Sequence, residues 1–333
     1  MSVQSAAPAP QPAPKTRIEI ESKIELLFNQ DPKTFATELS AWLVENDVKT
    51  IQLMSFFNDP KDKKETYDSK QFLPALFEAI SKSPCVTAIR LPFNRIDSNN
   101  IKELAAKFPE CPSLVTLDLA GNELGAQGVI DLATRIFPKL PNLQQLDLSF
   151  TKCDENGAKA LAYKFLLIPK LTTLNLIGNR IGTEGAKAIA TYINYCPGLT
   201  DLDLSSTELG DEGAYEFAVA LSKNPPPSLR SLSLNTIGIT EAGADALATF
   251  LNDCPNLKEL DLSHNHVDDT QANHLLETLA NQLDSLNLED NPEISPEVYR
   301  AVTNAFKAKQ DPNQPQAAAE VEKSRDLERK NQP

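Results

Sequence analysis

A group of closely spaced glycines offers the first candidate for chemistry. Residues 178–185 read GNRIGTEG, and glycine-rich turns of this kind can cradle a phosphate with backbone N–H groups. A nucleotide-binding loop also requires Lys followed by Ser or Thr at the start of the next helix, whereas this chain continues with Ala186, Lys187 and Ala188. The same pattern recurs as GNELGAQG at 121–128. We therefore expect these glycines to allow tight turns rather than to bind a nucleotide.

The histidines form the second candidate, because HxH beside carboxylates has the spacing of a metal site. His264, His266 and His274 lie close in sequence to Asp261 and Asp268. A catalytic metal site needs three convergent ligands, and a solvated turn explains His264 and His266 without one. We expect no metal site.

The cysteines follow a register rather than a pairing pattern. Cys111, Cys196 and Cys254 each precede a proline and lie three residues before a recurring LxxLxL pattern, and Cys153 falls where other units carry Leu or Ile. We expect these four to be small buried hydrophobic residues rather than disulfides or metal ligands. Cys85 lies outside this register. Five thiols without a pairing pattern favour a reducing, cytoplasmic compartment.

Motif and charge together exclude several classes of function. The chain has no GxSxG, HExxH or GxxxxGKS/T, so we expect no catalytic residues, no cofactor and no enzymatic activity. Its formal net charge of −14 makes nucleic acid and an anionic membrane surface poor partners, because both require an excess of Lys and Arg at the contact. No run of about 18 apolar residues occurs. A basic protein is the more natural partner.

The feature that must position any site is a repeat. The looser copies of LxxLxL begin at Val48 and Val86, and the spacing between successive copies runs from 26 to 38 residues. A period in this range is typical of a solenoid. Seven strict copies begin at Leu114, Leu143, Leu171, Leu199, Leu229, Leu257 and Leu283.

Each unit is predicted to be one strand followed by one helix. The leucine triplet alternates as in a strand, and the following segments, such as EGAKAIATYI, carry the apolar stripe of a half-buried helix. Because helices are wider than the spacing between strands, the stack must curve with its strands inside. An Asn after the triplet can bond to backbone groups freed at the strand end. Thr151 and Thr207 can do this only in part, and Ile237 cannot, so we expect an irregularity there. The Asn stands at 94, 122, 179, 265 and 291.

LxxLxLxxN followed by GAxxLAxxL at this period resembles the ribonuclease-inhibitor-like class of leucine-rich repeats. The resemblance implies an α/β horseshoe, with parallel strands on the concave face and helices on the convex face, over residues 48–308. We expect a helical N-terminal cap at 16–47, with Trp42 in its core, because an end repeat must cover its open core. The polar segments 1–15 and 309–333 are expected to be disordered tails. We expect a monomer.

The concave positions of the strands are rich in carboxylates and suited to a basic partner. LDLS is common in this repeat class, so part of this acidity is expected of any member. Asp201, Glu259 and Glu289 go beyond that habit. Ile177 is an apolar exception on the same face. The predicted partner-binding acids are Asp118, Asp147, Asp201, Asp203, Glu259, Asp261 and Glu289.

Aromatic residues supply the remaining partner-binding candidates. Phe93 and Phe150 each precede the Asn position, where a side chain can be partly exposed, and interfaces favour aromatic anchors ringed by polar groups. Either ring can also fold back over the strand ends, and both alternatives stay open. The first repeat contains an insertion at 56–70 that carries Phe57 and Tyr67, and such insertions are often functional.

These observations predict a protein–protein interaction module that uses its concave face and strand-end edge. The alternative is a GTPase-activating regulator of a Ran-like small GTPase, since such regulators share this repeat type, although their long acidic C-terminal tail is missing here. The polar tail with Glu320, Glu322 and Glu328 also resembles bacterial leucine-rich-repeat effectors that a type IV system delivers into host cytosol. The other interpretation is a cytosolic eukaryotic protein.

Overall fold

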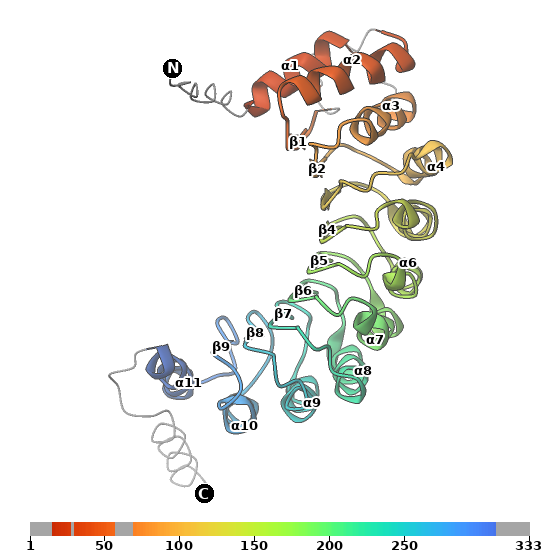
Figure 1. The fold of residues 1–333 in the computed structure, drawn as a ribbon. Coiled ribbons are helices and arrows are strands. Elements are labelled where there is room, and N and C mark those ends of the chain that lie inside the picture. The colour runs from red at the N-terminus through yellow and green to blue at the C-terminus, as the bar shows by residue number, and fades with distance from the viewer. Residues whose placement is uncertain (1–14, 28–29, 57–68, 311–333) are drawn as a thin grey trace, which may run out of the picture.

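The chain forms one curved stack of repeats. A computed structural model describes residues 15–27, 30–56 and 69–310. Nine parallel strands pair in chain order, each with the next, and line the inner side of the curve, while the helices form its outer side (Figure 1). The strands are β1 (Thr50–Gln52), β2 (Ala88–Arg90), β3 (Thr116–Asp118), β4 (Gln145–Asp147), β5 (Thr173–Asn175), β6 (Asp201–Asp203), β7 (Ser231–Ser233), β8 (Glu259–Asp261) and β9 (Ser285–Asn287).

The helices follow the strands one by one, after two helices that precede β1. Short 3-10 or π-helical turns continue three of them: η1 (Leu132–Ile136) with η2 (Phe137–Lys139), η3 (Phe165–Leu167) and η4 (Ile193–Tyr195). The α-helices are α1 (Arg17–Leu27), α2 (Pro32–Glu45), α3 (Ser69–Ser81), α4 (Ser98–Lys107), α5 (Gly125–Asp131), α6 (Glu155–Ala162), α7 (Gly182–Tyr192), α8 (Gly210–Lys223), α9 (Glu241–Leu251), α10 (Asp269–Leu279) and α11 (Pro296–Gln310).

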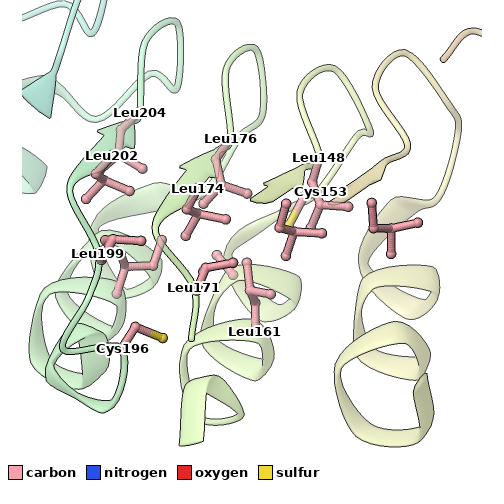
Figure 2. Close-up of a cluster of buried hydrophobic side chains, with 14 of the residues drawn as sticks. Leu148, Cys153, Leu161, Leu171, Leu174, Leu176, Cys196, Leu199, Leu202 and Leu204 are labelled. Carbon is pink, nitrogen blue, oxygen red and sulfur yellow. The ribbon is translucent and has the colours of Figure 1, made fainter. Parts of the chain in front are cut away.

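The leucine triplets fill the space between the sheet and the helices. In the unit of β5, Leu171, Leu174 and Leu176 are at most 1% exposed and lie beside the equivalent leucines of the next unit (Figure 2). Parallel pairing in register, such as Leu174 with Leu202, aligns these side chains from strand to strand. Each buried leucine contributes about 1.5–3 kcal/mol relative to an exposed one. The repeated leucines are therefore explained by packing of the core.

The glycines of the opening motif have two structural roles. Gly178 and Gly182 adopt φ of +67° and +62°, which favour glycine. Gly185 differs, since a Cβ there would lie 2.8 Å from the Cβ of Ala158 on the preceding helix. The turn expectation is confirmed for the first two and wrong for Gly185, which allows close approach of α7 to α6.

A ladder of asparagine side chains closes the strand ends, as the sequence predicts. Asn179 Nδ2 donates to the carbonyls of Leu148 and Leu176 at 2.8 and 2.9 Å. Its Oδ1 accepts from the backbone N–H groups of Thr151 and Cys153. One amide therefore joins two adjacent repeats, where backbone groups would otherwise be buried without partners.

The expected irregularity at Ile237 is confirmed, since this side chain bonds to no backbone group, while the asparagine of the following repeat makes the ladder's ordinary bonds to this unit. Asn265 Nδ2 donates to the Leu234 carbonyl at 3.0 Å. Its Oδ1 accepts from the N–H groups of Ile237, Gly238 and Ile239 at 3.1, 3.0 and 3.3 Å. The buried isoleucine thus keeps a packing role while its neighbour supplies the hydrogen bonds.

The N-terminal helices lie at the start of the stack. Ile24 of α1 and Leu39 and Leu43 of α2 are fully buried, and α2 packs on α3. Trp42 is only partly buried against the same core. The boundaries of a cap at 16–47 stay a prediction. The segments 1–15 and 309–333, expected to be disordered, lie almost wholly outside the described residues.

Candidate functional site

The concave face is built from two columns of strand residues. The first and third residues of each strand flank a buried leucine or isoleucine, so they lie on the opposite side of the sheet from the core. The pairing register places Asp118 beside Asp147, and Asp203 two strands from each of Asp147 and Asp261. The column of third residues therefore carries four aligned carboxylates.

These four carboxylates each serve the backbone. Asp203 Oδ1 accepts the N–H of Ser205 at 2.9 Å, and Asp261 Oδ1 accepts both the N–H and the hydroxyl of Ser263. Asn175 makes the same bond to the N–H of Ile177. The LDLS acids thus stabilise the strand end. The remaining bonds of this kind join Asp118 to the Ala120 N–H and Asp147 to the Ser149 N–H.

Burial and mutual repulsion disfavour the charged form at two of these positions. Burial raises the pKa of Asp118, the Ala120 N–H opposes that shift, and the charge of Asp147 adds to it. Burial also raises the pKa of Asp203, against its bonds to Ser205, with added repulsion from Asp261 and Asp147. A cation brought to this face would relieve the repulsion.

Three other acids have no such structural role. Asp201, Glu259 and Glu289 are exposed. Thr200 Oγ1 donates to Asp201 Oδ2 at 2.6 Å. Within the described residues no backbone N–H bonds to any of the three side chains, and no cation lies within 4 Å of them. They are the acids of this face most open to a partner.

The predicted aromatic anchors are fixed in a definite position. Phe93 is 44% and Phe150 is 54% exposed. A Cβ on Gly121 would lie 2.3 Å from the Phe93 ring, and one on Gly178 would lie 2.2 Å from the Phe150 ring. Each ring therefore lies against a glycine of the next repeat. The rings are therefore partly exposed and also folded back, each against the next repeat.

The position of these rings has left-handed backbone in every repeat. Phe93 and Phe150 have φ of +57° and +53°, a conformation that is a strained outlier for a bulky residue. Such strain at an exposed aromatic side chain is a pointer to function. The same position is occupied by Ser55, Phe93, Gly121, Phe150, Gly178, Ser206, Thr236, His264 and Asp290, with φ from +53° to +67°.

The remaining predicted partner residues divide into two groups. Ile177 is partly exposed beside Gly178. Phe57 and Tyr67 lie outside the described residues, so their role stays a prediction. Sequence reasoning missed Met54, which is 43% exposed at the position equivalent to Ile177. Alignment of its looser repeat on Leu53 would have found it.

A second exposed aromatic group lies at the carboxyl ends of outer helices. Tyr192 contacts Tyr163 and Tyr195, with ring centroids 4.9 and 6.2 Å apart. Tyr163 and Tyr195 are about half exposed, as is Leu166 nearby. Their signal in the sequence was an aromatic residue after the last buried turn of each helix.

The histidines considered for metal chemistry lie in separate contacts, each with a different carboxylate. His264 Nδ1 lies 3.4 Å from Asp290 Oδ2, and His266 Nδ1 lies 3.0 Å from Glu293 Oε1. His274 instead contacts Asp245. In the described part of the chain, no three His, Cys, Asp or Glu side chains converge as a metal would require.

The cysteine prediction is confirmed for burial. Cys111, Cys153, Cys196 and Cys254 are buried, and burial raises the pKa of each thiol to about 12. A thiol in that state is a poor nucleophile. Cys85 is partly exposed.

The fold and this open acidic face define the class of protein. Four segments match the leucine rich repeat family model: residues 110–133, 168–190, 195–218 and 253–270. With nine parallel strands in chain order, the protein is an α/β leucine-rich repeat solenoid. Among described residues, no helix is long and apolar enough to cross a bilayer.

Similar proteins share only parts of the chain. The Tonsoku-like proteins of Bos taurus and Mus musculus are each 34% identical over 92 residues, which are 27% of this chain and 7% of theirs. A structure of the yeast Rad7 and Elc1 complex covers 78% of this chain and 68% of its own, with 15% identity and a TM-score of 0.46. Leiomodin-1 actin-binding site 2 covers 53% and 97%, with 18% identity and a TM-score of 0.39. At such TM-scores neither structure informs on partners.

Proposed function

We propose that the protein is a non-enzymatic interaction module that binds a basic protein surface on its concave face and strand-end edge. Asp201, Glu259 and Glu289 carry the proposal, because they are exposed acids that accept no backbone N–H among the described residues. Four segments that match the leucine rich repeat family model support this repeat type. The solenoid presents these side chains on a preformed, curved surface, which lowers the entropy cost of binding.

The physical basis of recognition is electrostatic steering combined with local contacts. The seven concave acids lie on β3, β4, β6 and β8 and just beyond β9, and the sequence as a whole has the same sign, with a formal net charge of −14. Complementary fields raise association rates and make them fall with ionic strength. Binding should therefore weaken as salt rises.

The test compares two matched charge reversals. The concave variant carries Asp201→Lys, Glu259→Lys and Glu289→Lys, and the control carries Glu103→Lys, Glu110→Lys and Asp253→Lys, three exposed acids outside the strands. Partners captured by the wild-type chain are identified by mass spectrometry, purified and measured by surface plasmon resonance across salt concentrations. We expect the concave variant alone to lose at least tenfold in affinity. Equal loss in both variants, or none in either, refutes the proposal.

The finer parts of the proposal have their own tests. We propose a monomer of the ribonuclease-inhibitor-like class acting in cytosol, and light scattering tests the oligomeric state. The GTPase-regulator alternative predicts multiple-turnover GTP hydrolysis with a Ran-like GTPase. An effector role predicts that residues 309–333, fused to a reporter, direct its export by a type IV system, and that the export requires Glu320, Glu322 and Glu328.

A further inference from the structure

The strand-end edge and the adjoining concave column change character along the stack. At the left-handed position, the first five repeats carry Phe93, Phe150, two glycines and Ser55, whereas the last four carry only polar or charged side chains. The concave residue immediately before it shows a similar change, with the buried Ser149 as the polar exception in the first five repeats. That column reads Met54, Pro92, Ala120, Ser149 and Ile177 in repeats one to five, then Ser205, Asn235, Ser263 and Glu289.

The apolar part is a built surface rather than scattered exposure. Each phenylalanine ring lies against a glycine of the next repeat, and Phe93 and Phe150 are 44% and 54% exposed. Of the charged residues on this edge, Lys152 Nζ lies 3.0 Å from Glu123 Oε1, whereas Arg95, two residues after Phe93, is exposed and has no described carboxylate within 4 Å.

The acidic part has the opposite composition. It contains the exposed acids Asp201, Glu259 and Glu289, and further carboxylates of β6 and β8. Beside Glu289 lies an open hollow of about 570 Å³ whose wall includes Asp290, Ile294 and Tyr299. Carboxylates with an aromatic side chain suit a Lys or Arg that inserts its cation and lays its stem on apolar surface.

We infer that the partner docks in one direction, with an apolar block on Phe93, Phe150 and Ile177 and a basic block on repeats six to nine. This inference rests on the proposed function and specifies its partner class. Repeats four and eight are four strand spacings apart, or about 19 Å. The two blocks of the partner must be separated by about that distance. Charge complementarity selects a basic protein segment as the occupant.

The test uses a synthetic peptide with both blocks. It carries Leu-Trp-Leu at one end and Lys-Arg-Lys-Arg at the other, joined by ten Gly and Ser residues whose root-mean-square span is about 18 Å. A shuffled peptide of the same composition is the reference. We expect the block peptide to bind at least tenfold tighter to the full chain, as measured by fluorescence anisotropy at low salt.

Two variants separate the two parts of the surface. Phe93→Asn with Phe150→Asn removes the rings while keeping a residue that tolerates the left-handed backbone. It should weaken block-peptide binding at least fivefold without changing the slope of affinity against salt. Asp201→Asn with Glu259→Gln and Glu289→Gln should weaken binding and flatten that slope. The outer-side variant Leu166→Ser is the control and should do neither.

Direction is read by photo-crosslinking. A benzophenone at the apolar end should label residues between 93 and 178, and one at the basic end should label residues between 259 and 299. The inference is overturned if both ends label both regions equally, if the two peptides bind alike, or if the double phenylalanine variant keeps full affinity. Those results leave the proposed function standing, because its own test is loss of a captured partner on concave charge reversal.

Discussion

Replacing Gly178 by Ala tests how the exposed Phe150 ring is held, with Gly210→Ala as the matched control. Both glycines have left-handed backbone, with φ of +67° and +60°. A Cβ at Gly178 would lie 2.2 Å from the Phe150 ring, whereas a Cβ at Gly210 would meet nothing within 4 Å. The control therefore isolates backbone strain, and Gly178→Ala adds displacement of the ring.

The magnitudes follow from these two contributions. An alanine forced into left-handed backbone costs about 1–2 kcal/mol, and the stiffer unfolded chain offsets part of that cost. The Phe150 ring is 54% exposed, so its displacement forfeits roughly half of the 1.5–3 kcal/mol that full burial provides, or about 1 kcal/mol. We expect Gly210→Ala to lower the free energy of unfolding by about 1 kcal/mol and Gly178→Ala by about 2 kcal/mol.

Urea denaturation followed by circular dichroism gives both values. A double-mutant cycle with Phe150→Ser isolates the ring contribution, since contacting residues show coupling and distant ones do not. Coupling of about 1 kcal/mol should appear between residues 150 and 178, and none between 150 and 210. If Gly178→Ala costs no more than Gly210→Ala, the ring is not held by the glycine, and the fixed aromatic surface described above is wrong.

Three further predictions concern the strand ends, the acidic column and the thiols. Asn265→Ala should destabilise more than Asn179→Ala, by about 1–3 kcal/mol in urea denaturation, because Thr151 Oγ1 also bonds the Leu148 carbonyl whereas Ile237 offers nothing to Leu234. Asp203→Asn should raise the melting temperature at pH 7 but not at pH 3. Burial raises the pKa of Asp203 in the folded state, so ionising this carboxyl destabilises the fold. That destabilisation is missing below the unfolded pKa of 3.8 and grows as the pH rises past it. Ellman's reagent at pH 8 should react with one thiol of the native chain at least tenfold faster than with the other four, and Cys85→Ser should abolish that fast phase, because burial raises the pKa of the other four thiols to about 12.

The repeat made the fold predictable from the sequence, because the same packing pattern occurs in every unit. Period-2 leucines placed the strands, and the Asn positions placed the ladder, including the irregularity at Ile237. The bonds between adjacent repeats were not predictable from a single unit, since Asn265 Oδ1 accepts from three N–H groups of the preceding repeat. Relations between equivalent positions 28 residues apart require the register, which only the folded stack supplies.

The same limit explains the candidate site. The sequence identified Phe93 and Phe150 but left their orientation open, because that orientation depends on the missing side chains of Gly121 and Gly178 in the next repeats. It also set Asp201, Glu259 and Glu289 apart from the LDLS aspartates, but only by their departure from the repeat pattern. In the structure, hydrogen bonding to the backbone separates the two sets of acids. Each aspartate in the column of third strand residues accepts the N–H of the residue two positions later.

That separation decides which substitutions can inform on recognition. A change of Asp203 or Asp261 to Lys removes a backbone hydrogen bond as well as a charge, so lost binding would mix damage to the strand end with loss of attraction. Asn at those positions keeps the acceptor and removes only the charge. Asp201, Glu259 and Glu289 accept no backbone bond among the described residues, so charge reversal there leaves the turn intact. Selective loss of binding at these three positions, with stability unchanged, would therefore report on the partner.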